Sequence, residues 1–140
     1  MIHKSARSLA IFLLLVNAIG AFYGGWSLMS DPSGIALGLP RDWIYRIPFH
    51  DYFIPGVVLF IVNGIFSFLS ALAAMGQSRG YEKLIIAQGA LLTGWILVQV
   101  LILRTTEFLH FAMAGIGLTL LALGAILFMY RIRNGIANHG

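Results

Sequence analysis

The sequence YFIPGVVLFIVNGIFSFLSALAAMGQS occupies residues 52–78 and decides the fold, because these 27 residues contain no Asp, Glu, Lys or Arg. An α-helix rises about 1.5 Å per residue, so about 20 apolar residues cross the ~30 Å hydrocarbon core of a bilayer. Residues 8–30, 84–103 and 108–130 lack these four residue types in the same way. Each stretch is long enough for one crossing and too short for two.

The composition of the whole chain agrees with these stretches. Of the 140 residues, 59% are hydrophobic and 10% are charged, whereas a soluble domain carries roughly 25% charged residues. The composition argues against a soluble enzyme, a disordered chain and a nucleic-acid binder, despite the net charge of +4. The chain has no cysteine, which excludes disulfides, thiolate catalysis and cysteine-ligated metals.

These observations predict an all-α membrane protein, a single four-transmembrane-helix bundle over residues 1–140. Backbone groups in lipid must be paired within their own segment, so each apolar stretch is expected to be a helix. The predicted spans lie near 8–29, 54–76, 84–104 and 108–130. A cleavable signal peptide is the alternative for the first span, because Lys4 and Arg7 precede its apolar run.

The basic residues are distributed unequally between the two sides. One side holds six of them against Glu82, and the other side holds three against four acids. The positive-inside rule therefore predicts an inner-membrane protein with both termini in the cytoplasm. Arg131 and Arg133 are expected to anchor the last helix to anionic lipid.

The two halves of the chain share a weak pattern. Residues 20–26 match residues 89–95 at Gly, Ala, Gly and Trp, and residues 60–65 match residues 111–116 at Phe, Gly and Ile. The pattern indicates either two repeated helical hairpins or chance matching in an alphabet rich in Gly, Ala and Leu. The Gly/Ala faces also offer close helix contacts, within the bundle or in a homo-oligomer.

The outer loop, residues 30–53, is predicted to be structured and interfacial. Asp31, Pro32, Ser33 and Gly34 have the pattern of a type I turn. Pro40 can begin a short helix. Three aromatic residues in this loop can anchor it at the headgroup level or form a lid over a site, namely Trp43, Tyr45 and Tyr52.

Polar residues inside the spans are the candidate site. They can serve only as hydrogen-bonding contacts between helices, or they can line an outward-opening pocket for a lipid, a quinone or a partner helix. In the second interpretation Asn and Gln orient a polar headgroup, and the aromatic rings cover its apolar body. The predicted lining residues are Asn17, Tyr23, Asn63, Trp95, Gln99 and His110.

An alternative site would make the chain a small membrane enzyme or a solute transporter. It would use Asp51, Glu107 and His110 for acid–base chemistry. The i, i+3 spacing of Glu107 and His110 occurs in di-iron bundles, but those sites need two such motifs and two further Glu. Glu82 is the only other Glu in the chain, which argues against a di-iron centre. A metal site from His50, Asp51, Glu107 and His110 is the alternative, but we expect no metal or other cofactor.

Several motifs occur along the chain in an order that is similar to that of known membrane proteins. They include the 31–34 turn, the segment 49–52, Pro55-Gly56 and Asn63-Gly64, together with the glycine-rich end of the first span. The four spans with a glycine-rich end to the first resemble DoxX-like proteins, and the order of the other motifs resembles uncharacterised four-span bacterial membrane proteins. The resemblance implies an accessory membrane subunit, in some relatives tied to quinone-linked redox chemistry. We therefore expect a non-enzymatic binding or accessory protein whose partners are lipids, a quinone or another membrane protein.

Overall fold

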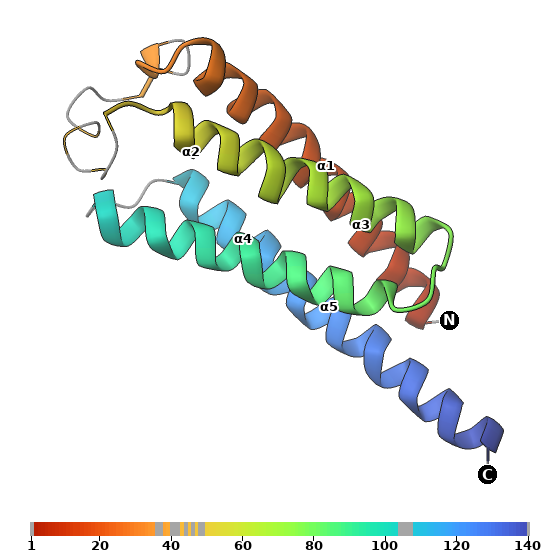
Figure 1. Ribbon diagram of the computed structural model, residues 1–140. Helices are drawn as coiled ribbons and strands as arrows, with labels where there is room; N and C mark the ends of the chain where they lie inside the picture. Colours follow the sequence, from red (N-terminus) through yellow and green to blue (C-terminus); the bar gives the residue numbers. More distant parts are fainter. Residues whose placement is uncertain are drawn as a thin grey trace.

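The computed structural model describes residues 2–35, 38–39, 43, 45, 47, 50–103 and 108–139, without the side chains of residues 102, 103, 109 and 135–139. Four long helices run up, down, up and down (Figure 1), and the described residues form no strand. The second helix is continuous but is built from three segments. The helical elements are α1 (Ile2–Ser30), α2 (Phe53–Val58), the π-helix η3 (Leu59–Ile65), α3 (Phe66–Met75), α4 (Tyr81–Leu103) and α5 (Phe108–His139).

Each long helix is long and apolar enough to cross a membrane. The prediction of four apolar helices in an all-α chain is confirmed. The helix ends differ from the predicted spans, because α1 already begins at Ile2 and α5 continues to His139. Charged residues mark where an apolar stretch stops, but they do not interrupt an α-helix, which can extend beyond it.

The predicted turn at residues 31–34 is confirmed. The Gly34 amide donates to the Asp31 carbonyl at 3.1 Å, and the Ser33 hydroxyl donates to Asp31 Oδ1 at 2.6 Å. Gly34 has φ +80°, which a residue with a side chain rarely adopts. Tyr52 closes the loop over this turn, because its amide donates to the Pro32 carbonyl at 2.9 Å. The short helix predicted from Pro40 lies largely outside the described residues.

The turn between α3 and α4 joins two helical hairpins. The Ser78 amide donates to the Ala73 carbonyl at 2.9 Å, and the Gln77 amide donates to the Ala74 carbonyl at 3.2 Å. These two bonds form a Schellman motif, which usually places glycine in the left-handed position. Here that position is Gln77, with φ +51°.

Within each hairpin, glycines bring two helix backbones close together. A Cβ added to Gly25 of α1 would lie 2.8 Å from the Gly56 carbonyl oxygen. A Cβ added to Gly89 of α4 would lie 2.8 Å from the Gly117 carbonyl oxygen of α5. Helices in lipid gain no hydrophobic driving force from association, so close backbone packing of this kind is a main source of their attraction.

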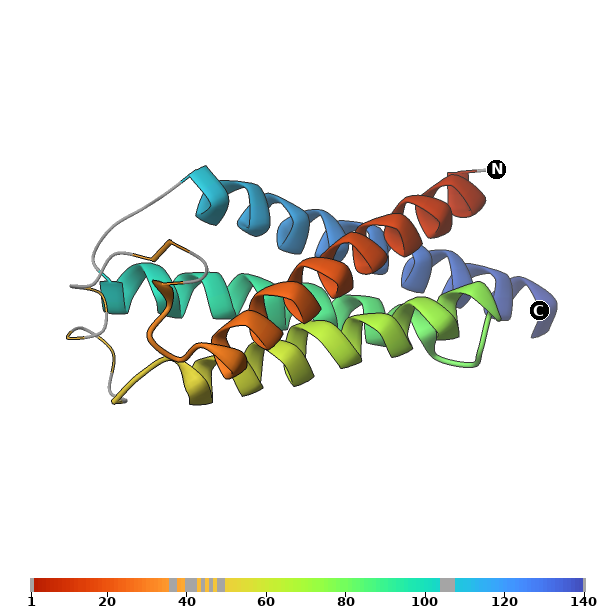
Figure 2. The same cartoon turned by 90° about the horizontal axis from the view of Figure 1, so that it is seen from above.

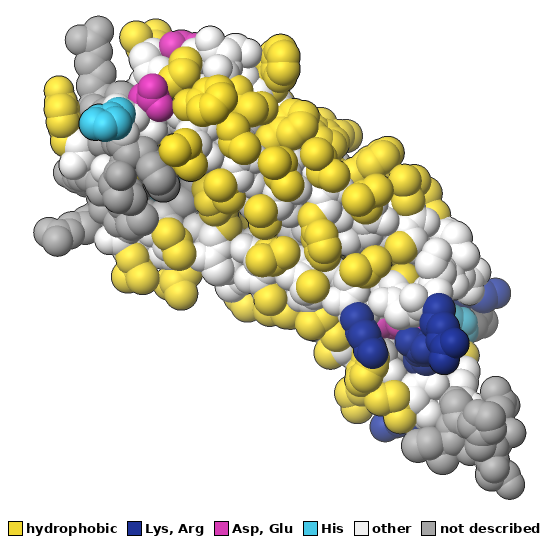
Figure 3. All heavy atoms as spheres, in the orientation of Figure 1, with side chains coloured by type: hydrophobic (Ala, Val, Ile, Leu, Met, Phe, Trp, Pro, Cys, Tyr) yellow, Lys and Arg dark blue, Asp and Glu magenta, His cyan; other side chains and the backbone are white. Residues whose placement is uncertain are grey.

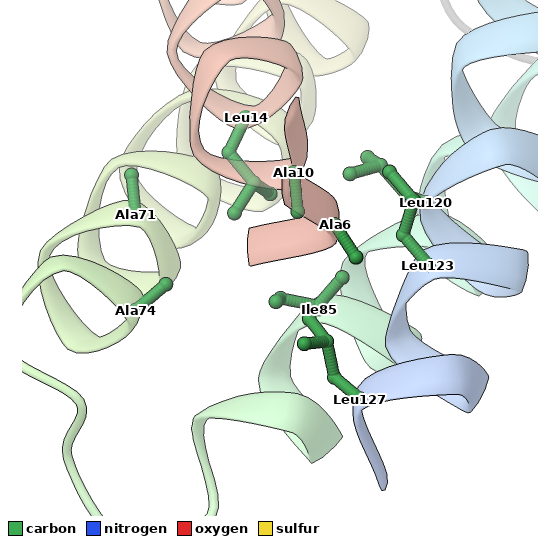
Figure 4. Packing of buried hydrophobic residues seen from close by; sticks show 9 residues of the cluster. All are labelled: Ala6, Ala10, Leu14, Ala71, Ala74, Ile85, Leu120, Leu123 and Leu127. Carbon is green, nitrogen blue, oxygen red and sulfur yellow. The ribbon is translucent and has the colours of Figure 1, made fainter. Parts of the chain in front are cut away.

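The hydrophobic core lies toward the end of the bundle that holds Ile2, the 76–80 turn and the last turns of α5, here called the basic end. All four long helices contribute to it (Figure 4). The opposite end, which holds residues 31–52, is called the loop end. In Figure 1 and in Figure 2 the hairpins lie closer together toward the basic end than toward the loop end. The core residues are Ala6, Ala10, Leu14, Ala71, Ala74, Ile85, Leu120, Leu123 and Leu127.

The visible surface separates charge from apolar area. Lys and Arg side chains gather at the basic end, and hydrophobic side chains cover the middle (Figure 3). Asp and His side chains appear at the loop end of the same view. This pattern is typical of a helical bundle whose middle is surrounded by lipid.

Candidate functional site

Two predicted residues from different helices meet in the buried interior. The side chains of Asn17 in α1 and Asn63 in η3 are 1% and 0% exposed. Asn17 Nδ2 donates to Ser67 Oγ at 2.7 Å and to the Asn63 carbonyl oxygen at 3.3 Å. Both hydrogens of the Asn17 amide group are therefore used within the first hairpin. The two bonds also fix the orientation of this carboxamide, because a carbonyl oxygen can only accept.

The backbone is unusual at this same level. From Leu59 to Ile65 the second helix is a π-helix, and the Phe66 amide donates to the Ile61 carbonyl five residues earlier. π-Helical turns are rare and occur frequently at functional sites. The Asn17 side chain hydrogen-bonds the Asn63 carbonyl here, and a side chain that enters the backbone ladder is a known cause of irregular helix geometry.

A third carboxamide connects this group to the second hairpin. Gln88 in α4 is 0% exposed, and its Nε2 donates to Asn63 Oδ1 at 3.1 Å. We call Asn17, Asn63, Ser67 and Gln88 the amide cluster. Three of its atoms are buried without a hydrogen-bond partner, namely Asn17 Oδ1, Asn63 Nδ2 and Gln88 Oε1. The cluster thus keeps two unused acceptors and one unused donor group.

The other predicted lining residues do not join the amide cluster through a described hydrogen bond. Tyr23 is 69% exposed on α1, facing away from the bundle interior. Trp95 and Gln99 on α4 are partly exposed. His110 is buried, at 8% exposure, near the start of α5. The structure therefore brings Asn17 and Asn63 together. The glutamine that hydrogen-bonds to Asn63 is Gln88, whereas the predicted one was Gln99.

The predicted lid residues have three different environments. Tyr45 is 87% exposed, Trp43 is partly buried, and Tyr52 is 6% exposed. The Tyr52 ring packs on the turn at Gly34, where an added Cβ would lie 2.8 Å from a ring carbon. Tyr52 therefore stabilises the loop in this structure.

The alternative acid–base group is described only in part, because Glu107 lies outside the described residues. Asp51 Oδ1 accepts a hydrogen bond from the Phe53 amide at 3.0 Å, a local contact that stabilises the start of α2. Within the described part of the chain, no group of three or more His, Cys, Asp or Glu side chains could hold a metal ion.

A second candidate site is an open cavity of about 450 Å³ on the surface of the basic end. Its wall comes from the first turns of α1, the 76–80 turn, the start of α4 and the last turns of α5. It includes three guanidinium groups and one carboxylate. The lining residues are His3, Arg7, Gln77, Ser78, Arg79, Gly80, Tyr81, Glu82, Leu127, Tyr130, Arg131 and Asn134.

The charges of this basic cavity are unevenly paired. Arg131 Nη1 lies 3.3 Å from Glu82 Oε2, and the Glu82 side chain is only 6% exposed. Glu82 also lies in the first turn of α4, where the helix dipole favours a negative charge. Arg7 and Arg79 form no ion pair with the described residues. The cavity therefore presents two unneutralised guanidinium groups.

An aromatic contact forms another part of the wall and connects α1 to α5. The rings of His3 and Tyr130 stack with centroids 4.2 Å apart and an angle of 11° between their planes. Both rings line the same cavity as the Arg131–Glu82 pair. The cavity is therefore bounded by contacts from both hairpins.

Sequence reasoning identified the basic residues of this end but not the cavity they line. Arg7, Arg79 and Arg131 are separated by at least 52 residues from one another, so only the fold brings them together. Comparison of the chain with protein-family models, with curated proteins and with solved structures finds no match.

Proposed function

We propose that this chain is a multi-pass inner-membrane protein with both ends in the cytoplasm. In this proposal it is a non-enzymatic binding or accessory subunit that holds the phosphate headgroup of an anionic lipid in its basic cavity. The single observation that carries the proposal is the cavity itself, in which Arg7 and Arg79 lie beside the already paired Arg131.

Guanidinium groups suit a phosphate because their N–H groups form a rigid fork that matches two phosphate oxygens. A volume of about 450 Å³ is within the usual range of small-molecule sites. Basic pockets between transmembrane helices on the cytoplasmic side are typical headgroup sites. The pairing of Arg131 with Glu82 fixes one wall, so the other two arginines supply the net positive charge.

The location of the cavity supports a lipid ligand. It lies at the end of the bundle where Lys and Arg gather, next to the apolar middle of the surface (Figure 3). Under the positive-inside rule this is the cytoplasmic side. A bound lipid would place its headgroup among the arginines and its chains along the apolar helices.

This proposal moves the ligand from the side expected from sequence. The outward-opening pocket with Trp95, Gln99 and His110 stays a prediction. The basic cavity lies at the opposite end, and its lining residues suit an anionic ligand. A quinone, which carries no charge, would gain little from Arg7 and Arg79.

The test is binding of phosphatidylglycerol to the protein in nanodiscs of neutral lipid, measured by native mass spectrometry at increasing lipid concentration. The Arg7→Gln/Arg79→Gln double variant should bind about tenfold more weakly, or ~1.4 kcal/mol, which is at the low end for charge-assisted hydrogen bonds. Arg131 is left intact, because its removal would strand the buried Glu82 carboxylate.

Lys83→Gln/Arg133→Gln is the matched control. It removes the same charge at the same end of the bundle. Lys83 and Arg133 are exposed and do not line the cavity. It should change affinity much less than the cavity variant. Equal losses in both variants would mean that only the general charge of this end attracts lipid, and the proposed site would be wrong.

A further inference from the structure

The two hairpins are joined differently along the bundle. Toward the basic end the hydrophobic core draws on all four long helices. Toward the loop end α2 packs against α1, while α4 and α5 have their close glycine contact at Gly89 and Gly117. The Gln88–Asn63 hydrogen bond crosses between the hairpins beyond this core, on the side where they move apart. It therefore lies where a small change can alter their separation.

The Asn63 carboxamide uses only part of its hydrogen-bonding capacity at this position. Its Oδ1 accepts from Gln88 of the other hairpin, while its Nδ2 and the Asn17 Oδ1 of its own hairpin are both buried without partners. One of these atoms is a donor and the other an acceptor, and Asn17 already bonds the Asn63 backbone. A buried amide without partners is costly, so the bond to Gln88 holds Asn63 in an arrangement that leaves part of its hydrogen-bonding capacity unused.

We propose that the Gln88–Asn63 hydrogen bond is a releasable clamp between the hairpins. In the closed state, which this structure shows, Gln88 holds Asn63. In the open state this hydrogen bond is broken, and the hairpins separate further at the loop end.

Three features would let the clamp work without unfolding the bundle. The core at the basic end serves as the hinge. Close glycine packing at Gly25 and Gly89 keeps each hairpin rigid. The π-helical turns around Asn63 provide an irregular segment that can change its hydrogen bonding locally. Rigid bodies that rotate about a packed contact are a common form of conformational change.

Because the chain contains no cysteine, spin labels attach only to cysteines that are introduced for the distance measurement. Spin labels at Trp26→Cys and Leu101→Cys report the separation of α1 and α4 toward the loop end, and labels at Leu9→Cys and Met129→Cys report α1 and α5 toward the basic end. All four native side chains are exposed. Distances are measured by electron–electron double resonance in nanodiscs of neutral lipid, where the phosphate cavity plays no part.

Gln88→Met keeps the length of the side chain and removes the bond. We expect the loop-end distribution to become broader and to shift to longer distances, while the basic-end distribution stays unchanged. Gln99→Met is the matched control, because Gln99 is a partly exposed glutamine on the same helix. It should leave both distributions as they are.

An unchanged loop-end distribution in Gln88→Met would overturn the proposal, as would an equal shift in Gln99→Met. A change in the basic-end distances would also contradict it, because it would mean general loosening. If Gln88→Met does not fold, Gln88→Met/Asn63→Leu removes both partners and is measured in the same way. The same loop-end shift is expected, and its absence in that variant overturns the clamp.

Discussion

The two hairpins contain aligned glycines that occupy opposite environments. In the sequence match Gly20 corresponds to Gly89 and Gly25 corresponds to Gly94. A Cβ on Gly25 or Gly89 would lie 2.8 Å from backbone oxygen of the partner helix, whereas a Cβ on Gly20 or Gly94 would meet nothing within 4 Å. The first hairpin therefore packs closely at the second aligned glycine, Gly25, and the second hairpin packs closely at the first aligned glycine, Gly89.

The second and fourth helices differ in the same way. A Cβ on Gly64 would lie 2.9 Å from the Phe22 ring, and one on the matching Gly115 would meet nothing within 4 Å. Asn63 lies in a π-helix, while its counterpart Ala114 lies in the regular helix α5. A shared residue pattern therefore does not fix which face of a helix is used for packing. The predicted repeat stays a prediction.

We expect the largest changes in the free energy of unfolding from four Gly→Ala variants at these aligned positions. Gly25→Ala and Gly89→Ala should each lower the free energy of unfolding by about 1–3 kcal/mol, because the added methyl group meets backbone that cannot easily move. Gly20→Ala and Gly94→Ala should instead raise it by roughly 0.5–1 kcal/mol through helix propensity. Reversible unfolding in mixed micelles measures all four.

The sign of the effect is the informative quantity. If aligned glycines gave effects of the same sign, the two hairpins would pack through equivalent faces, and the contrast described above would be wrong. Each variant serves as a control for its aligned partner, because both make the same substitution inside an apolar helix.

A smaller effect is expected at the turn that joins the hairpins. Gln77 has φ +51° at the position where a Schellman motif usually has glycine. Gln77→Gly should raise the free energy of unfolding by about 0.5–1 kcal/mol, since a left-handed conformation costs a residue with a Cβ roughly 1–2 kcal/mol and glycine recovers only part of this. Thermal unfolding followed by circular dichroism measures it, and a lower midpoint temperature would contradict the backbone assignment.

Much of the fold could be predicted because it depends on local composition. Gaps between charged residues located four helices, and the Asp31–Gly34 pattern located a turn. The amide cluster was predicted in part, since polar residues in apolar spans must find partners and Asn17 and Asn63 were placed at similar depth. The spacing places Gln88 and Gln99 on one face of the helix, and Gln99 was predicted to line the site, whereas Gln88 is the residue that meets Asn63.

The remaining features depend on contacts between distant segments. The π-helix around Asn63 involves a side chain from α1, and nothing in the local sequence FIVNGIF indicates it. The basic cavity combines Arg7, Arg79 and Arg131 from three parts of the chain. Sequence reasoning placed all three on one side of a membrane, but their arrangement around a cavity requires the packing of α1 against α5.

The proposed headgroup site requires that the basic cavity faces the cytoplasm and that the bundle is embedded in the membrane. Single cysteines introduced by Asn134→Cys at the basic end and Tyr45→Cys at the loop end can be labelled with a membrane-impermeant maleimide. We predict labelling of the Tyr45→Cys protein in intact spheroplasts, and of the Asn134→Cys protein only after permeabilisation. Labelling of both positions in intact spheroplasts, or the reverse pattern, would contradict the proposed orientation and remove the basis for a cytoplasmic headgroup site.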